Sequence, residues 1–165
     1  MLHLSAAEAK ARAAAESADW PNACAMCGVI AAPKHVVAEN ATAICVLDRY
    51  AARRAHLIVV YRKHVESIAE LPWSDYEAMQ RLSWEACRAL REVVRPVRTF
   101  VASLGSAQKR TISFPHTHVH VLPLYDGDER DRPAAVLTWS NGVFVYEDGE
   151  AEDLVTRLRA AWPAP

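Results

Sequence analysis

The stretch His116-Thr-His118-Val-His120-Val-Leu122 carries a histidine at every second position. Successive side chains of a β-strand point to opposite faces, so the three histidines share one face and the residues between them share the other. Neighbours on one face lie about 6.6–6.8 Å apart, so a row of imidazoles can hold a metal at one end and a phosphate further along. A single histidine on a sheet is more often a hydrogen-bonded structural residue, but three in a row predict a chemical site.

The sequence around this strand predicts an alternation of short strands and helices. Two Ser-x-x-Glu patterns, beginning at Ser5 and Ser74, have the spacing of a capping box and predict helix starts. The dipeptide Asn141-Gly142 is a strong signal for a hairpin between two strands. The predicted strands are residues 42–47, 56–61, 99–104, 116–124, 136–140 and 143–147, and the predicted helices are residues 5–20, 74–95 and 150–162.

Composition and charge indicate a globular chain with a sizeable core. Of its 165 residues, 52% are hydrophobic and 24% are charged, and the net charge is -1. This balance argues against a long polyanion or an anionic membrane as partner, so any phosphate recognition must be local. No apolar run reaches the roughly 18 residues that span a bilayer, and the N-terminus lacks a secretory apolar stretch, so we expect a cytoplasmic protein. We divide the chain into a helical N-terminal appendage, residues 1–20, and a main domain, residues 21–165.

The motif Cys24-Ala-Met-Cys27 is half of a tetrahedral zinc site, because two thiolates two residues apart can chelate one ion from a tight turn. A redox pair is the competing interpretation. Redox pairs with this spacing normally open a helix, whereas the flanking Pro21-Asn22 and Gly28 indicate a turn. A pair of thiols without a metal is the third alternative. Cys45 and Cys87 lie in apolar runs and are expected to be buried and reduced.

The histidine stretch resembles the motif of the histidine-triad (HIT) family, His-φ-His-φ-His-φ-φ, in which φ is apolar. Thr117 is the one departure inside the motif. The resemblance extends upstream to Asp48 and to Ala55-His56-Leu-Ile-Val-Val-Tyr-Arg-Lys-His64, and covers roughly residues 24–125. Two polar residues of the family are missing. Ile112 stands where the family has a glutamine, and Ala102-Ser103 lie in the region where the family has an asparagine. Ala55 stands where the family has glycine, and Ser113-Phe-Pro-His116 is similar to the dinucleotide phosphorylase branch.

This resemblance implies an α+β, HIT-like fold, an antiparallel sheet with packed helices, in a homodimer. It implies that His118 is the nucleophile, which forms a nucleotidyl-imidazole intermediate. His120 and Ser113 are then expected to contact the phosphate, and Asp48 the ribose hydroxyls. His56 is expected to support the triad strand from a neighbouring strand. A strand-end turn residue is the alternative for Asp48, and a merely structural histidine is the alternative for His56.

The resemblance also implies the two missing metal ligands. Zinc-containing relatives complete the site with a histidine near the end of the second strand and with the first histidine of the triad, which are His64 and His116 here. A closed Cys2His2 site of this kind holds a structural Zn²⁺. His35 and His56 are alternatives for the third ligand.

The expected function is hydrolysis or nucleotidyl transfer at the α-phosphate of a small nucleotide, such as a dinucleoside polyphosphate or a nucleoside phosphoramidate. A dinucleotide phosphorylase or nucleotidyltransferase is an alternative that Ser113-Phe-Pro favours. A non-catalytic nucleotide-binding protein is a third possibility, because the glutamine and asparagine contacts of the family are missing. Membranes and long nucleic acids are not expected partners.

Overall fold

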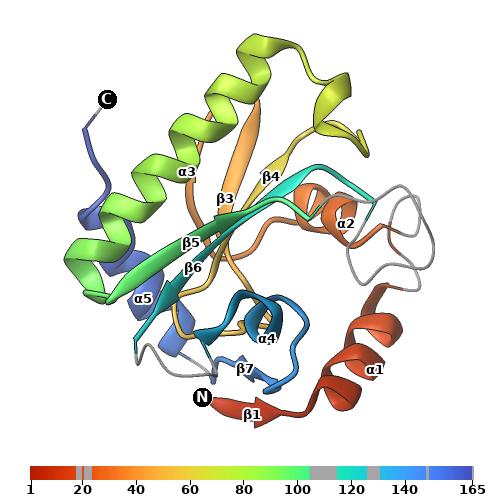
Figure 1. Cartoon of the computed structure of the whole chain (residues 1–165), viewed down its shortest axis with the longest axis vertical. Helices are drawn as coiled ribbons and strands as arrows, with labels where there is room; N and C mark the ends of the chain where they lie inside the picture. Colours follow the sequence, from red (N-terminus) through yellow and green to blue (C-terminus); the bar gives the residue numbers. More distant parts are fainter. Residues whose placement is uncertain (18–19, 21–23, 105–114, 126–130, 148, 165) are drawn as a thin grey trace.

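The computed structural model describes residues 1–17, 20, 24–104, 115–125, 131–147 and 149–164. Its main feature is a five-stranded antiparallel sheet of order β2-β3-β4-β6-β5 (Figure 1). Four of these strands were predicted from the sequence, and the α+β HIT-like fold class is confirmed. The strands are β2 (Val36–Glu39), β3 (Ala43–Leu47), β4 (Leu57–Tyr61), β5 (Arg98–Ala102) and β6 (His118–Leu124).

The long helix α3 (Trp73–Val93) and the helix α5 (Glu150–Ala160) cover one face of the sheet (Figure 1). Val119 and Val121 of β6 pack in this core, as their position between the histidines predicts. The core also contains apolar residues of both helices, among them Met79, Leu82, Leu90, Leu154 and Leu158.

Two short helices, α2 (Ala25–Ala31) and α4 (Pro133–Leu137), pack on the opposite face. Helix α2 lies against apolar side chains of β3 and β4, whereas Val136 of α4 packs with Leu122 and Leu124 of β6. Along this face of β6 the order is therefore His118, His120 and then the leucines under α4. The histidines occupy the part of the strand that α4 leaves uncovered.

A second sheet has two strands, β1 (Leu2–Leu4) and β7 (Val143–Val145), which pair antiparallel. Helix α1 (Ala6–Ser17) follows β1 and begins with the predicted capping box. The backbone N–H of Ser5 donates to Oε2 of Glu8 at 2.8 Å, and the backbone N–H of Glu8 donates to Oγ of Ser5 at 3.3 Å. A single turn of 3-10 helix, Ile68–Glu70, precedes α3.

Three local predictions are wrong. The expected hairpin at Asn141-Gly142 does not form, because residues 133–137 are helix α4, with Pro133 at its first turn, and β7 pairs with β1 instead. Helix α3 begins at Trp73 after Pro72, so Ser74 does not cap it. The Cys24–Cys27 segment opens helix α2 and is not an isolated turn.

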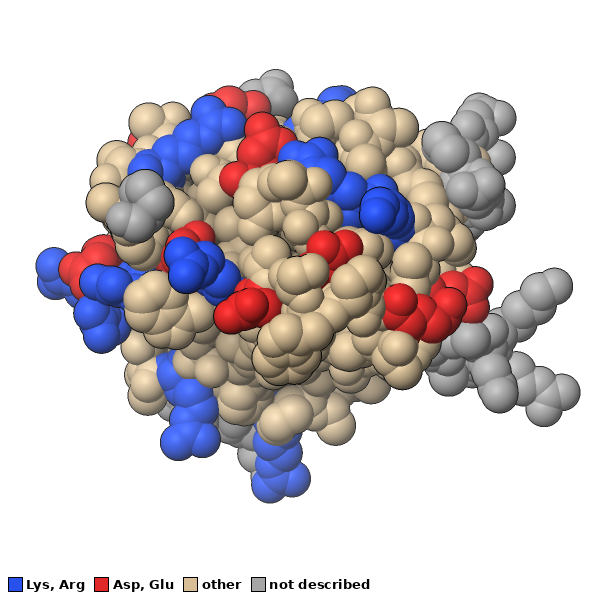
Figure 2. All heavy atoms as spheres, turned by 90° about the horizontal axis from the view of Figure 1, so that it is seen from above, with Lys and Arg blue, Asp and Glu red and all other residues tan. Residues whose placement is uncertain are grey.

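No helix in the described part of the chain combines the length and the apolar composition that crossing a membrane requires. On the face of the molecule shown in Figure 2, the described basic and acidic side chains are interspersed.

Candidate active site and metal centre

His116, His118 and His120 lie in the order that the sequence predicts, but they take up different environments. His116 precedes β6 and is fully buried, and His118 on the strand is 1% exposed. His120 is half-buried. The register of β6 with β4 sets His118 opposite Val60 and His120 opposite Ile58.

Four side chains form one continuous line of hydrogen bonds. Oδ2 of Asp48 lies 2.9 Å from Nδ1 of His56, and Nε2 of His56 lies 3.0 Å from Nδ1 of His120. Nε2 of His120 lies 3.1 Å from Nε2 of His118, whose Nδ1 donates to the backbone carbonyl of His116 at 2.6 Å. The backbone nitrogen of Ala52 lies 3.4 Å from Nδ1 of His56, which is a longer contact than those in the line.

This line of hydrogen bonds determines the protonation of the three imidazoles in it. Both ends are acceptors, because the carboxylate of Asp48 and the carbonyl of His116 have no proton to give. Four hydrogen bonds therefore need four protons on His56, His120 and His118, and three neutral rings carry only three. A line in which every contact is an N–H hydrogen bond therefore contains one imidazolium, with the ionised Asp48 as its counter-charge.

The surroundings of His118 and His120 favour the neutral form of both rings. Burial lowers the pKa of His118 and lowers that of His120 further, and neighbouring histidines add to the effect on His120. Burial tends to raise the pKa of Asp48, but the charge and the hydrogen bond of His56 outweigh it and keep this pKa below its ordinary value. His118 and His120 are therefore neutral, and Nε2 of His118 carries a lone pair.

Two further contacts hold the histidine strand β6 and the residues just before it. Oγ of Ser103 donates to the backbone carbonyl of His118 at 2.8 Å. Thr117, the departure within the motif, donates from Oγ1 to the carbonyl of Val65 at 2.8 Å. The threonine therefore ties the start of β6 to the segment after His64 and leaves the histidine face unchanged. Ser113, expected at the phosphate, lies outside the described residues.

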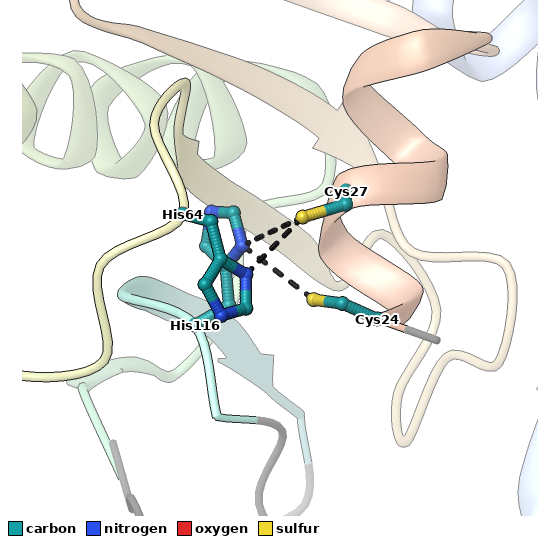
Figure 3. Close-up of side chains that lie close together, drawn as sticks. All are labelled: Cys24, Cys27, His64 and His116. Atoms are coloured by element: carbon teal, nitrogen blue, oxygen red, sulfur yellow. Dashed lines mark hydrogen bonds between the residues drawn. The ribbon is translucent and has the colours of Figure 1, made fainter. Parts of the chain in front are cut away.

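The second cluster consists of Cys24, Cys27, His64 and His116, whose side chains point toward one another (Figure 3). Both sulfur atoms lie 3.6 Å from Nδ1 of His116, and Sγ of Cys27 lies 3.2 Å from Nδ1 of His64. All potential ligand atoms lie within 4.8 Å of one another. The structure thus brings together the four residues that the sequence assigned to a metal.

The geometry and chemistry of this donor set fit Zn²⁺. Bond lengths of about 2.3 Å to sulfur and 2.0–2.1 Å to nitrogen give a sulfur–nitrogen edge of about 3.6 Å in a tetrahedron. His116 donates from Nε2 to the carbonyl of Tyr61 at 2.7 Å, which leaves Nδ1 free for a metal. Burial lowers the pKa of His116, which favours the neutral ring that a metal requires. Nε2 of His64 lies 3.8 Å from a carboxylate oxygen of Glu66.

The two alternative third ligands lie elsewhere. His35 is 3.6 Å from Oε1 of Glu152 on α5, and His56 belongs to the line that starts at Asp48. Neither is in the Cys2His2 cluster. The positions of His64 and His116 are those implied by the family resemblance.

Comparison with known families agrees with this geometry. Residues 23–129, well over half of the chain, match the family described as "Scavenger mRNA decapping enzyme C-term binding". The chain belongs to this family and is a histidine-triad (HIT) protein. The Cys-x-x-Cys pair lies within the matched region.

Several known proteins resemble the chain. An uncharacterised HIT-like protein of Mycobacterium tuberculosis is 27% identical over 141 residues, which cover 84% of this chain and 92% of that protein. The AP-4-A phosphorylase of the same species is 30% identical over 94 residues, which cover 56% of this chain and 48% of the phosphorylase. The structure of a Zn-bound histidine triad family protein from Mycobacterium smegmatis superposes with a TM-score of 0.63 at 22% identity, covering 84% of this chain and 91% of that one.

Sequence reasoning missed the backbone acceptors and one hydroxyl of the HIT site. The carbonyl groups of Tyr61 and His116 set the orientation of two rings, but a backbone carbonyl leaves no mark in a sequence. Ser103 was noted only because the family's asparagine is missing from that region. Its position near the end of the strand predicted over residues 99–104 gave no indication that it contacts the histidine strand β6.

Proposed function

We propose that this HIT protein is a nucleotide hydrolase or nucleotidyl transferase that acts at the α-phosphate, with His118 as the nucleophile. One observation carries the proposal. Because Nδ1 of His118 donates to the His116 carbonyl, the lone pair of the neutral ring is on Nε2, which faces His120. An imidazole held in this way can attack phosphorus without first losing a proton.

In the proposed first step, Nε2 of His118 forms a bond to the α-phosphorus while the bond to the leaving-group oxygen or nitrogen breaks. His120 carries a proton on Nε2 and gives it to the leaving group. A proton from Nε2 of His56 then passes to Nδ1 of His120, 3.0 Å away. Water or another acceptor cleaves the nucleotidyl-imidazole in a second step.

Asp48 has two roles in this proposal. It keeps the imidazolium of His56 paired, and it is expected to accept hydrogen bonds from the ribose hydroxyls. The two roles are compatible, because a carboxylate offers about four acceptor positions. The contacts with His56 and with the backbone N–H of Tyr50 use two of them.

We further propose that Cys24, Cys27, His64 and His116 hold a structural Zn²⁺ ion. Four protein ligands close the coordination shell, which is typical of structural and not of catalytic zinc. When bound, the metal would neutralise the two thiolates and link α2 to the start of β6. The residues that act on the substrate are then His118 and His120.

The test of the proposed nucleophile is His118→Ala. We expect this variant to keep its fold and much of its nucleotide affinity and to lose at least about three orders of magnitude in turnover, because a covalent route is removed. An acid-labile nucleotidyl adduct on His118, trapped by quenching and located by mass spectrometry, is the direct evidence. An adduct on another residue, or near-normal turnover of the variant, would overturn the assignment.

A phosphorylase is the second candidate, and the similarity to an AP-4-A phosphorylase favours it. The two reactions differ in the acceptor. Water releases a nucleoside monophosphate from the intermediate, whereas inorganic phosphate releases a nucleoside diphosphate. Turnover of a dinucleoside polyphosphate with and without phosphate, with the products identified, separates them. Binding of adenosine nucleotides without any turnover would instead support a non-catalytic nucleotide-binding protein.

A further inference from the structure

The cysteines of the proposed metal centre open a helix, which changes what their chemistry can be. Cys24 has extended backbone angles of φ -114° and ψ 120° and is the residue before α2, and Cys27 lies in the first turn. Both sulfur atoms contact the same nitrogen of His116 at 3.6 Å. A turn at this position would argue against a redox pair, and the structure has a short helix there instead.

We propose that Cys24 and Cys27 form an oxidisable dithiol, which reacts with a peroxide to give an intramolecular disulfide. The potential ligand atoms lie within 4.8 Å of one another, and in a Cys-x-x-Cys segment a side-chain rotation can close the remaining gap to a sulfur–sulfur bond of about 2.05 Å. The other two cysteines belong to the core on the opposite face of the sheet, where Cys45 is fully buried.

One cysteine sulfur attacks the peroxide, the O–O bond breaks, and the thiol proton goes to the departing oxygen, so that a sulfenic acid and water form. The second thiol attacks the sulfenic sulfur, the S–S bond forms, and the sulfenic oxygen leaves as water with the second thiol proton. Two thiols and hydrogen peroxide thus give one disulfide and two water molecules. Cys27 is partly exposed and Cys24 is 3% exposed, so Cys27 is oxidised first and Cys24 closes the disulfide.

Disulfide formation would reach the histidine strand through His116. The disulfide removes both thiolate ligands, so a zinc ion in the cluster leaves. His116 then loses its partners at Nδ1, while its backbone carbonyl still accepts the proton of His118. A movement of His116 also moves this carbonyl, and it therefore changes the direction in which Nε2 of His118 points. This last step rests on the proposed function, whereas the formation of the disulfide does not.

The experiment uses the full chain loaded with Zn²⁺ and treated with hydrogen peroxide near one equivalent. We expect a disulfide between Cys24 and Cys27 in peptide mass spectra, loss of zinc to a chromogenic chelator, and a fall in turnover of about 10-fold or more, the scale of losses around a metal centre. A thiol reductant together with zinc should restore all three. Cys87→Ser, the matched control, should respond like the native chain, and Cys24→Ser should form no disulfide.

If the protein keeps its zinc and both thiols, or if a cysteine is oxidised to sulfinic acid without a disulfide, the proposed disulfide between Cys24 and Cys27 is wrong. If the disulfide forms and turnover does not change, the proposed effect of the disulfide on His118 is wrong. If the reduced protein has no turnover at all, the proposed function fails, but the disulfide and the released zinc are still measured. In that case the NMR signals of the His118 imidazole show whether disulfide formation changes the surroundings of this ring. Signals that do not change on oxidation would disprove the proposed effect on His118.

Discussion

The carboxylate of Asp48 contributes to the electrostatic surroundings of His118 and His120 through its ion pair with His56. It ends a line of acceptor and donor atoms whose other end is a backbone carbonyl, so the three rings share four protons. Burial favours neutral rings at His118 and His120, and the hydrogen bond from Nδ1 of His118 to the His116 carbonyl leaves the lone pair of His118 on Nε2. Chemically identical side chains thus obtain different roles from their partners alone.

Asp48→Asn tests this distribution of charge. The amide removes the negative charge that pairs with the His56 imidazolium, so the extra proton is no longer stabilised. We expect kcat to fall about 10- to 100-fold, the usual range for a lost supporting contact, with the fold retained. Asp153→Asn on the exposed side of α5 is the matched control. A rise in KM with unchanged kcat would show that Asp48 only binds ribose, because uniform binding affects KM alone.

The pH dependence follows from the lowered pKa values of His118 and His120. Both rings must be neutral for the proposed chemistry, so turnover should persist at pH 6.5 and fall only in more acidic solution. In the unfolded chain these rings bind protons from about pH 6.5 downward, whereas in the native state they resist protonation. Stability should therefore also fall as the pH drops below about 6.5. Turnover measured as a function of pH and melting temperatures measured as a function of pH test the two effects. A loss of turnover on acidification whose midpoint lies above pH 6.5 would contradict the lowered pKa values.

At the scale of elements, helix α2 carries the cysteines and fits against β3 and β4 through Met26 and its neighbours. If zinc joins α2 to the start of β6, the metal supplies part of the folding free energy. We expect about one zinc per chain in protein prepared without chelators. Cys24→Ser should lower the melting temperature more than Cys87→Ser does, because only Cys24 is a proposed ligand. Equal melting temperatures, or zinc-free protein, would remove the basis for the site.

The sequence was sufficient where one periodic pattern decides an element. The β-branched runs of β3 and β4, the alternation in β6 and the spacing of apolar residues in α3 all predicted elements that the structure contains. The failed hairpin shows why other parts were not predictable. Asn141-Gly142 is a local signal, but the partner of β7 is β1, about 140 residues away, and only the folded chain brings the two together.

The candidate site was predictable for a similar reason. Side chains such as His118 and Cys24 are visible in the sequence, and the family resemblance suggested how they combine. The line from Asp48 to His118 depends on the register Ile58–His120 between β4 and β6, which no local pattern encodes. The order of proton donors along the line therefore became visible only in the structure.

At the scale of the whole molecule, β5 is an edge strand whose outer side has no partner among the described residues. Apolar side chains at or beside this edge are exposed, with Val97 at 74% and Val101 at 48%. An open edge with apolar side chains favours pairing with another chain. β5 also lies beside the histidine strand β6, with Ala102 opposite His120. We therefore expect the homodimer that the HIT resemblance implies to form at β5.

The prediction is that the chain, of mass 18.3 kDa, sediments or scatters light as a dimer, and that Val101→Lys makes it a monomer. In a dimer that pairs through β5, a lysine at this position places one positive charge from each copy at the shared edge and interrupts the apolar contact between the copies. The fold of each copy should not change, because Val101 is half-exposed. Trp84→Lys is the matched control, because Trp84 is 57% exposed on α3 and is not part of β5. If Trp84→Lys dissociates the dimer and Val101→Lys does not, the interface lies on α3. A native chain that is monomeric throughout would exclude the dimer itself.

Because β5 and β6 are adjacent, the monomeric variant should also lose turnover if the second copy supports the histidine strand β6.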